Sequence, residues 1–426
     1  MTGRVDGNLW RTSSAVHVEA PPLMADADAD LVIIGGGFTG NAAALEAARR
    51  GASVIVLEAE TVGHGGSGRN VGLVNAGLWL APRDVVAQMG QDAGLKLIGL
   101  LADAPKLVWS LIERENIDCE ATPNGTLHLA HSTPGLRNLE ERHRQGVELG
   151  APVQLFDALE TARRTGSRAF YGSLFDPRAG TIQPLSYARG LACAALRAGA
   201  RLHEQTAVKR VERIGDRWQV MANGHTVRAR SLLLATNAYF KGIDIAVRPQ
   251  FVAVNYCQFA TAPMPEPLRA EILSGGEGCW DTALVMSSFR TDKEGRMILG
   301  GIGDAGGRGA AVHAGWARRK LRQVYPQLAG LTFEYSWHGR IAMTSDHIPK
   351  IVRLGPSAYA CFGYSGRGIG PGTVFGTRVA ASLLDGCENG LPVAPVVNHR
   401  ERLAAMRAVY YESGAVLVHA STGGYA

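Results

Sequence analysis

Residues 31–40, LVIIGGGFTG, decide the fold, because they join a short apolar run to a glycine-rich turn. Four consecutive apolar residues are typical of a strand that is buried on both faces of a parallel sheet. A helix of small residues is predicted over 41–50, with Gly51 as its cap, and a second strand is predicted over 53–57. Together these segments predict a βαβ unit of about 30 residues.

Gly35, Gly37 and Gly40 have the spacing of a dinucleotide-binding loop. The first glycine permits a tight turn, the second lets the backbone approach a pyrophosphate, and the third lets the helix pack closely on the strand. Glu58 follows the second strand, where a carboxylate accepts hydrogen bonds from ribose hydroxyls and disfavours a 2′-phosphate. The alternative is a glycine-rich surface turn with a solvated Glu58. The spacing alone does not discriminate between FAD and NAD.

Length and composition limit the classes of protein that this chain can belong to. Its 426 residues suffice for two domains, and a hydrophobic fraction of 46% excludes a disordered or fibrous protein. The 44 Lys and Arg residues against 38 Asp and Glu give a net charge of +6. Because the basic residues are spread along the chain, no nucleic-acid partner is expected, whereas an acidic substrate stays open.

Cysteine and histidine positions give no sign of a metal site. The six cysteines form no Cys-x-x-Cys pair, and the histidines have no ligand spacing. The first 25 residues lack the pattern of a signal peptide, and no apolar run reaches the roughly 18 residues of a membrane span. We therefore expect a cytoplasmic protein with free thiols, without metal and without membrane insertion.

Periodicity predicts the remaining elements. Residues 1–27 read as an arm, because Pro21 and Pro22 disfavour a helix there. The predicted helices cover 84–116, 133–150, 185–198, 314–324 and part of 366–384. The predicted strands cover 201–212, 217–222, 225–235 and 359–363, with a β-rich layer over 250–345.

Further motifs follow the βαβ unit along the chain. They are Ser67-Gly68-Arg69-Asn70-x-Gly72, 175–180 with 184–191, 233–239, Trp337-x-Gly339 with Thr344-x-Asp346 and Pro349, and 363–368. Over residues 8–390 the sequence thereby resembles the FAD-dependent D-amino-acid oxidase superfamily, which includes glycine and sarcosine oxidases. Within it, the likeness is closest to the gamma-glutamylputrescine oxidase group.

This resemblance implies an α/β architecture with two discontinuous domains. A Rossmann-like FAD-binding domain would take 28–82, 150–245 and 335–395. A smaller antiparallel, β-rich α+β substrate domain would take 83–149 and 246–334. The arm at 1–27 and a C-terminal extension at 396–426 would lie outside both domains.

The resemblance also implies which residues bind the cofactor. They are Gly35, Gly37, Phe38, Thr39, Gly40, Glu58, Ala59, Ser67, Arg69, Asn70, Gly72, Val208, Ala235, Asn237, Gly366, Arg367, Gly368 and Ile369. Some relatives bond FAD covalently, through a His at the position of Arg69 or a Cys near Ile341 or Ala342. Neither nucleophile is present here, so non-covalent FAD is expected.

Three residues are candidates for catalysis by resemblance: Arg69, Tyr364 and Arg367. The likeness places 363–368 at the pyrimidine end of the flavin, where reduction leaves negative charge and a cation stabilises it. Arg367 would supply that cation, unless it is a surface Arg beside a helix start. Arg69 would lie on the substrate side of the flavin, unless it only packs its loop onto FAD.

The position of Ile341 bears on the substrate. Glycine and D-amino-acid oxidases hold the substrate carboxylate with an Arg at this position, and the neighbouring Arg340 should point elsewhere on a strand. The sequence therefore favours, as substrate, an amine whose carboxylate, if it has one, is remote from the reacting carbon. Tyr256 and Phe289 are candidate aromatic walls of the substrate site, with burial in the core as the alternative.

These observations predict an FAD-dependent amine oxidase or dehydrogenase that acts on a small-molecule amine or amino acid. A C–H next to the amine nitrogen would give hydride to flavin, and the imine would hydrolyse to an aldehyde or ketone. O2 or another acceptor would take the electrons. One alternative is a D-amino-acid, opine or proline-type dehydrogenase feeding a quinone or partner subunit. Another is a flavin-binding subunit of a larger complex without amine turnover of its own.

Overall fold

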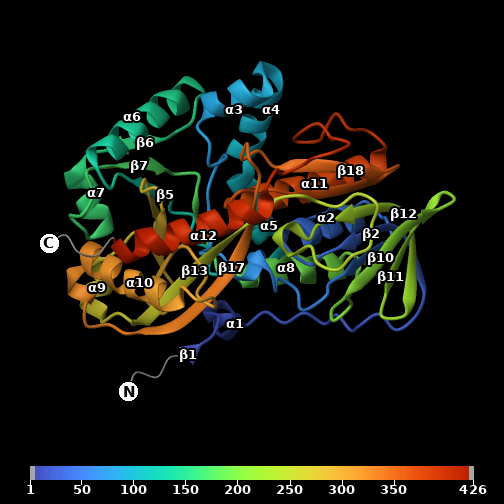
Figure 1. Ribbon diagram of the computed structural model, residues 1–426, viewed down its shortest axis with the longest axis horizontal. Helices are drawn as coiled ribbons and strands as arrows, with labels where there is room; N and C mark the ends of the chain where they lie inside the picture. Colours follow the sequence, from blue (N-terminus) through green and yellow to red (C-terminus); the bar gives the residue numbers. More distant parts are fainter. Residues whose placement is uncertain (1–4, 422–426) are drawn as a thin grey trace.

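Two β-sheets with surrounding helices make up the protein, whose computed structural model describes residues 5–421. One sheet has eight strands and the other has nine. The eight-stranded sheet lies on the right in Figure 1, and the nine-stranded sheet lies on the left. This arrangement confirms the predicted α/β fold class with a second, β-rich domain.

The eight-stranded sheet contains the strands of the predicted βαβ unit. Its members are β2 (Ala27–Ile34), β3 (Val54–Leu57), β9 (Arg201–His203), β10 (Val208–Ile214), β11 (Arg217–Ala222), β12 (His225–Leu234), β18 (Lys350–Gly355) and β19 (Ala358–Phe362). The order is β10-β11-β12-β2-β3-β9, with β19 beside β12 and β18 beside β19. Ile34 pairs in parallel with both Leu57 and Leu234, so three strands end at one level.

Both faces of this sheet are buried, which explains its uninterrupted apolar runs. Leu31 and Ile33 pack into the core under the helices, whereas Val32 and Ile34 pack into the core on the opposite face. Helices that contribute to the first core include α2 (Phe38–Arg49), α5 (Ala104–Glu115), α8 (Pro184–Arg197) and α11 (Ile369–Asp385).

The nine-stranded sheet is mostly antiparallel, as expected for the β-rich part. Its order is β1 (Val5–Asp6), β17 (Phe333–Met343), β13 (Val252–Pro263), β16 (Arg296–Ile302), β15 (Ser287–Thr291), β14 (Gly278–Asp281), β5 (Thr126–Leu129), β7 (Ser173–Asp176) and β6 (Gln154–Phe156). Helix α10 (Ala310–Val324) buries Trp316 and Leu321 against it.

Smaller elements complete the fold. They are α3 (Pro82–Met89), α4 (Gln91–Ala102), α6 (Thr133–Glu148), α7 (Ala158–Thr165), α9 (Glu266–Glu271), the pair β4 (Leu73–Val74) and β8 (Gly180–Thr181), and the 3-10 turns η1 (Gly66–Gly68), η2 (Asn237–Tyr239) and η3 (Pro326–Leu328). Helices α3 and α4 project from the top of the molecule in Figure 1, beside α6.

Sheet membership differs from the predicted segmentation at three places. Strands β6 and β7 belong to the nine-stranded sheet, although 150–245 was assigned to the FAD domain. The same holds for β17 within 335–395. Conversely, α5 lies within 83–149 yet packs in the core of the eight-stranded sheet. Strand pairing and helix packing join distant segments, so chain order does not fix these memberships.

The arm at 1–27 contains a short helix that the sequence did not predict, α1 (Leu9–Ser13), which precedes the two prolines. Asn8 caps this helix, and Trp10 is fully buried. Residues 1–4 of the arm lie outside the described residues, as do residues 422–426 of the C-terminal extension.

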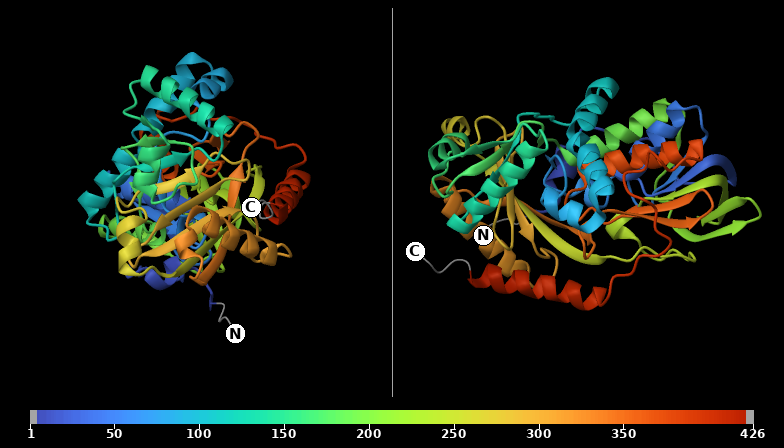
Figure 2. Two further views of the ribbon diagram at one scale, coloured as in Figure 1. Left: turned by 90° about the vertical axis from the view of Figure 1, so that its left-hand side faces the viewer. Right: turned by 90° about the horizontal axis from the view of Figure 1, so that it is seen from above.

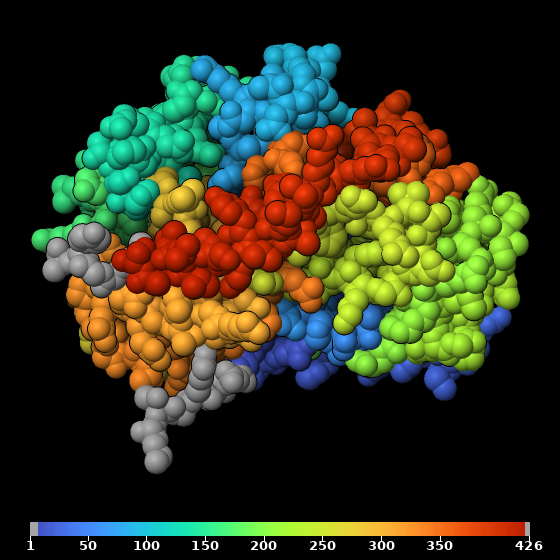
Figure 3. Space-filling view, viewed as in Figure 1, coloured from blue at the N-terminus to red at the C-terminus, as the bar shows by residue number. Residues whose placement is uncertain are grey.

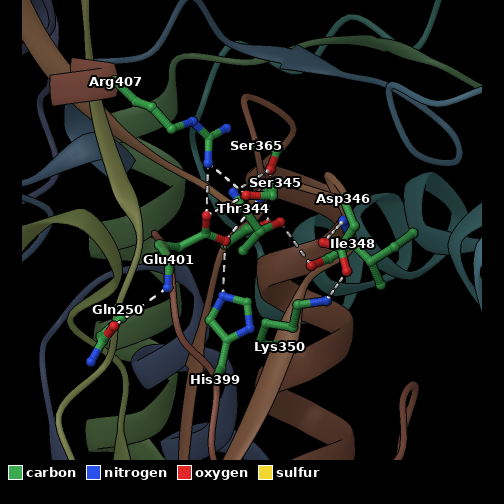
Figure 4. A network of polar contacts seen from close by, with 11 residues as sticks. Gln250, Thr344, Ser345, Asp346, Ile348, Lys350, Ser365, His399, Glu401 and Arg407 are labelled. Atoms are coloured by element: carbon green, nitrogen blue, oxygen red, sulfur yellow. Dashed lines mark hydrogen bonds and ion pairs between the residues drawn. The ribbon is translucent and has the colours of Figure 1, made fainter. Parts of the chain in front are cut away.

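The C-terminal extension contains a long helix, α12 (Ala404–Ser421), that the sequence also did not predict. It lies along one side of the molecule in Figure 2 and forms a surface ridge in Figure 3, packed against β13 and α10. Glu401 ties the extension down by accepting bonds from the Ser345 amide at 2.8 Å and from Arg407 at 2.9 Å (Figure 4). Among residues 5–421, no helix is long and apolar enough to cross a membrane.

Candidate functional site

The glycine-rich turn between β2 and α2 forms a cradle that side chains would fill. A Cβ on Gly35, whose φ is +108°, would lie 2.9 Å from the carbonyl oxygen of Ala235. A Cβ on Gly40 would overlap the carbonyl oxygen of Gly35, and one on Gly37 would lie 2.8 Å from Ser67 Oγ. The turn therefore keeps its backbone open to a ligand and its helix close to the strand.

Donors at the start of α2 fit a pyrophosphate. No side chain caps this helix at Gly37, and the amide of Phe38 donates to Ser67 Oγ at 3.0 Å. Thr39 lies in the same first turn, at the positive end of the helix dipole. In the described chain, the hydroxyl of the neighbouring Thr236 is buried without a hydrogen-bond partner. The turn thus fits the phosphate part of a dinucleotide such as FAD.

Glu58 lies directly after β3, beside this cradle. Its Oε2 accepts from the Gly36 amide at 2.7 Å, and its Oε1 accepts from the Glu60 amide at 3.0 Å. Burial raises the pKa of this carboxyl, although the two amide bonds oppose the shift. Of the other predicted nucleotide contacts nearby, Ala59 is exposed and Val208 is buried at the start of β10.

We expect Glu58→Ala to weaken FAD binding more than it changes turnover of the FAD-saturated enzyme. Losing a charged hydrogen-bond partner costs about 1.5–3 kcal/mol, or about tenfold to a hundredfold in affinity. A flavin dissociation constant measured by titration of the apoprotein checks this. Glu60→Ala removes an exposed carboxylate two residues away and should bind FAD normally. Equal constants for both variants would contradict the role of Glu58.

The loop after β3 is held in shape by Asn70. Its Nδ2 donates to the carbonyls of Gly66 and Ser67, and its Oδ1 accepts from the Gly72 amide at 2.9 Å. The arm fastens the same loop from outside, because Trp10 Nε1 donates to the Asn70 carbonyl at 2.8 Å. Ser67, Asn70 and Gly72 therefore support the loop that also reaches the start of α2.

Arg69 connects this loop to the nine-stranded sheet. Its Nε donates to the carbonyl of His64 at 2.7 Å, and its Nη1 donates to the carbonyl of His338 at 3.1 Å. Trp337 Nε1 donates back to the carbonyl of Arg69 at 2.8 Å. These bonds favour the packing role among the two that the sequence left open.

The segment after β19 approaches the cradle from the other side. Asn237 Oδ1 accepts from the Gly363 amide at 3.1 Å, which links the segment after β12 to the segment after β19. Gly366 has a φ of +96°. Helix α11 begins at Ile369, and Gly368 occupies its N-cap position without a side-chain hydrogen bond to the helix. The positive end of a second helix dipole therefore lies at this loop.

Tyr364, the remaining residue predicted to act in catalysis, lies between α2 and α11. It is buried in the core of the eight-stranded sheet, where its hydroxyl contacts Thr39 Oγ1 at 2.8 Å. Its ring lies edge-on to Phe375 of α11, and burial holds its pKa well above the usual range. The side chain thereby connects α2 to α11.

Arg367 points into a cavity of about 290 Å³. Its Nη1 donates to the carbonyl of Ala76 at 2.7 Å, and its guanidinium lies 4.7 Å from the ring centroid of Trp280. Burial lowers the pKa of Arg367 to about 9, so it stays cationic at neutral pH. The position in the cavity wall favours the predicted role of Arg367 over that of a surface Arg.

Three further residues that line this cavity were missed by the sequence prediction: His128, Arg142 and Trp280. The rings of His128 and Trp280 stack with centroids 3.4 Å apart. Arg142 follows Leu139 by three residues on α6, and Leu139 is fully buried. This spacing of three residues puts Arg142 near the buried side of the helix, and it was the sequence signal that could have identified Arg142 as a cavity residue.

The predicted aromatic walls do not line the cavity. Phe289 packs in the core of the nine-stranded sheet against Phe170 and Tyr325, because its side of β15 faces α10. Tyr256 is buried beneath Gly339 of β17. Its hydroxyl has no hydrogen-bond partner among the residues described. No group of three His, Cys, Asp or Glu side chains within 5–421 could hold a metal ion.

Comparison with known proteins identifies the family. The family model for FAD dependent oxidoreductases matches residues 30–382. "Gamma-glutamylputrescine oxidoreductase" of Escherichia coli is 30% identical over 361 residues, which cover 84% of each chain. "Probable oxidoreductase OrdL" of Haemophilus influenzae is 30% identical over 370 residues, or 85% of each chain.

A solved structure supports the fold. Glycine oxidase from Geobacillus kaustophilus superposes with a TM-score of 0.71 over 86% of this chain and 96% of that one, at 20% identity. The glycine cradle, the half-buried Glu58 and the family match agree with one another. The chain belongs to the family of FAD-dependent oxidoreductases that also contains gamma-glutamylputrescine oxidoreductase and glycine oxidase.

Proposed function

We propose that this enzyme oxidises the carbon–nitrogen bond of a small amine or amino acid. The observation that carries the proposal is the cavity beside the loop before α11, which has Arg367 in its wall. A cavity of about 290 Å³ suits a small molecule. Two similar proteins are named for gamma-glutamylputrescine and glycine, which are both amines.

The cavity wall favours the reactive form of an amine. Bound FAD would accept a hydride from the carbon next to nitrogen, while the nitrogen lone pair forms the C=N bond. Water would then hydrolyse the imine to an aldehyde or ketone and release ammonia or an amine. Arg367 lines the cavity, and a nearby cation lowers the pKa of a bound ammonium. The amine is thereby held neutral, and no side chain needs to act as a strong base.

We also propose that FAD contacts the residues that the sequence predicts. They comprise the cradle with Glu58 and Ala59, the loop with Ser67, Arg69, Asn70 and Gly72, Val208, Ala235 and Asn237 near β12, and Gly366, Arg367, Gly368 and Ile369 at α11. FAD is proposed to bind without a covalent bond, because Arg69, Ile341 and Ala342 are not nucleophiles. The electron acceptor is proposed to be O2 or another oxidant.

Flavin bleaching tests the function and separates it from its rivals. The purified protein is mixed without oxygen with a panel of amines and amino acids, and the flavin spectrum is followed. Bleaching that recovers in air supports an oxidase. Bleaching that recovers only with a quinone supports a dehydrogenase of the D-amino-acid, opine or proline type. A flavin that no amine bleaches would contradict amine oxidation and support a subunit of a larger complex.

We expect ω-amino acids and acylated diamines to reduce the flavin faster than D-alanine does. The reason is Ile341, which stands on β17 where related oxidases hold an α-carboxylate with Arg. The comparison is made by kcat/KM, or by the anaerobic reduction rate where turnover is slow. Faster reduction by D-alanine or glycine would contradict the expected preference.

We expect Arg367→Met to lower the two-electron potential of the flavin. A cation worth about 1–3 kcal/mol to reduced flavin corresponds to about 20–65 mV. Arg367→Lys should recover part of this change, because the effect needs charge more than a fork of donors. An unchanged potential together with a raised substrate dissociation constant would make Arg367 a substrate contact instead.

A further inference from the structure

We infer that Arg142 binds a carboxylate of the substrate, so that the substrate is an amino acid whose carboxylate is separated from the reacting carbon by an aliphatic chain. This inference rests on the proposed function and names its substrate class. Arg142 lies on α6, whereas the proposed FAD contacts lie on the loops after β2, β3, β12 and β19. It lines the same cavity as Arg367.

Within residues 5–421, the guanidinium of Arg142 donates hydrogen bonds only to neutral oxygens. Its Nε donates to Asn138 Oδ1 at 3.0 Å, and one Nη donates to the carbonyl of Trp79 at 3.2 Å. Asp84 lies near enough to raise the pKa of Arg142, but within residues 5–421 no carboxylate forms an ion pair with it. Burial is nevertheless the dominant effect and lowers this pKa. A half-buried cation without a counter-ion is costly, and an anionic ligand would offset that cost.

Other charges around the cavity point in the same direction. Burial is the main cause that lowers the pKa of His128 and of Arg367, and the nearby charge of Arg142 lowers both further, so the three groups share one region. Asp176 is the acidic residue of the lining, and Arg178 occupies both of its oxygens at 2.9 and 2.7 Å. The cavity therefore keeps an excess of positive charge.

The rest of the lining is largely apolar. Leu78, Leu80, Val85, Leu95 and Ile98 contribute to it from the segment that includes α3 and α4. Such a wall suits methylene groups, while a guanidinium suits a carboxylate. An ω-amino acid combines these features and also agrees with the absence of an Arg at position 341.

The first experiment measures binding and does not depend on amine turnover. Hexanoate and hexanamide are titrated into the FAD-loaded protein by calorimetry. We expect the wild type to bind hexanoate about tenfold to a hundredfold more tightly than hexanamide, and Arg142→Met to lose this difference. Arg137→Met, an exposed Arg on the same helix, should retain it. Equal binding of the two ligands by the wild type would overturn the inference without any variant.

The second experiment measures flavin reduction by 6-aminohexanoate and hexylamine. Arg142→Met should raise the dissociation constant of 6-aminohexanoate about tenfold or more, leave the limiting reduction rate nearly unchanged, and leave hexylamine unaffected. Arg142→Lys should recover part of the affinity. If no amine reduces the flavin while hexanoate binding still requires Arg142, amine oxidation fails and the carboxylate site stands. If hexylamine reduces the flavin and Arg142→Met binds hexanoate as tightly as the wild type does, the carboxylate site is contradicted while amine oxidation stands.

Discussion

Replacing Gly40 by alanine is expected to give a protein that purifies without flavin. The added Cβ would overlap the carbonyl oxygen of Gly35, closer than real Cβ atoms approach any backbone atom. Helix α2 must then move away from β2, and overpacking of this kind costs about 1–3 kcal/mol. This displacement changes the turn that is proposed to hold the pyrophosphate. We therefore expect Gly40→Ala to lose more free energy of FAD binding than free energy of unfolding.

The measurement is the ratio of flavin to protein absorbance after purification, followed by FAD titration of the apoprotein. Gly330→Ala is the matched control, because a Cβ there meets nothing within 4 Å. Circular dichroism establishes that the variant is folded. A folded Gly40→Ala protein with the flavin content of the control would show that this turn does not approach the cofactor.

Trp10→Ala is expected to destabilise the protein by about 3–5 kcal/mol, although residue 10 lies in the arm. Trp10 is fully buried, lies edge-on to Trp337 with ring centroids 5.9 Å apart, and donates to the carbonyl of Asn70. Its loss leaves a cavity beside β17 and frees the loop around Asn70. Denaturant unfolding should show a lower midpoint, and FAD affinity should fall with it.

Trp79→Ala provides the comparison for this change. Trp79 is 41% exposed and contacts His347 edge-on. Its removal should cost much less than the removal of Trp10, because solvent can fill the space. Similar unfolding midpoints for the two variants would mean that the arm is not part of the stable core.

Local chemistry made the nucleotide turn predictable. The apolar run 31–34, the glycines and Glu58 lie within about 30 residues, and each requirement of the turn acts over a few bonds. The structure accordingly places α2 at Phe38–Arg49 and Glu58 next to the Gly36 amide. Propensity and hydrophobic pattern agree in this segment.

Packing between distant segments was not predictable in the same way. The directions of Tyr364 and Phe289 depend on which face of each sheet the helices cover, and the pattern of a short buried strand does not reveal this. Helix α12 has apolar residues on several sides, including exposed Met406, Val409 and Tyr410, so it lacks a clear amphipathic pattern. The cavity joins α6 to the loop before α11, and no motif spans that distance.

The interleaving of the two sheets has a consequence for how the chain reaches this structure. The eight-stranded sheet draws strands from residues 27 to 362, and β17 of the nine-stranded sheet pairs with β1 near the start of the chain. The nine-stranded sheet is complete only when Val5 has met Tyr335, and the eight-stranded sheet only when Ala27 has met Val227 and Leu232 has met Ala358. High contact order of this kind slows folding and leaves strand edges open during synthesis. A nascent chain should therefore need protection by chaperones until β19 has emerged from the ribosome.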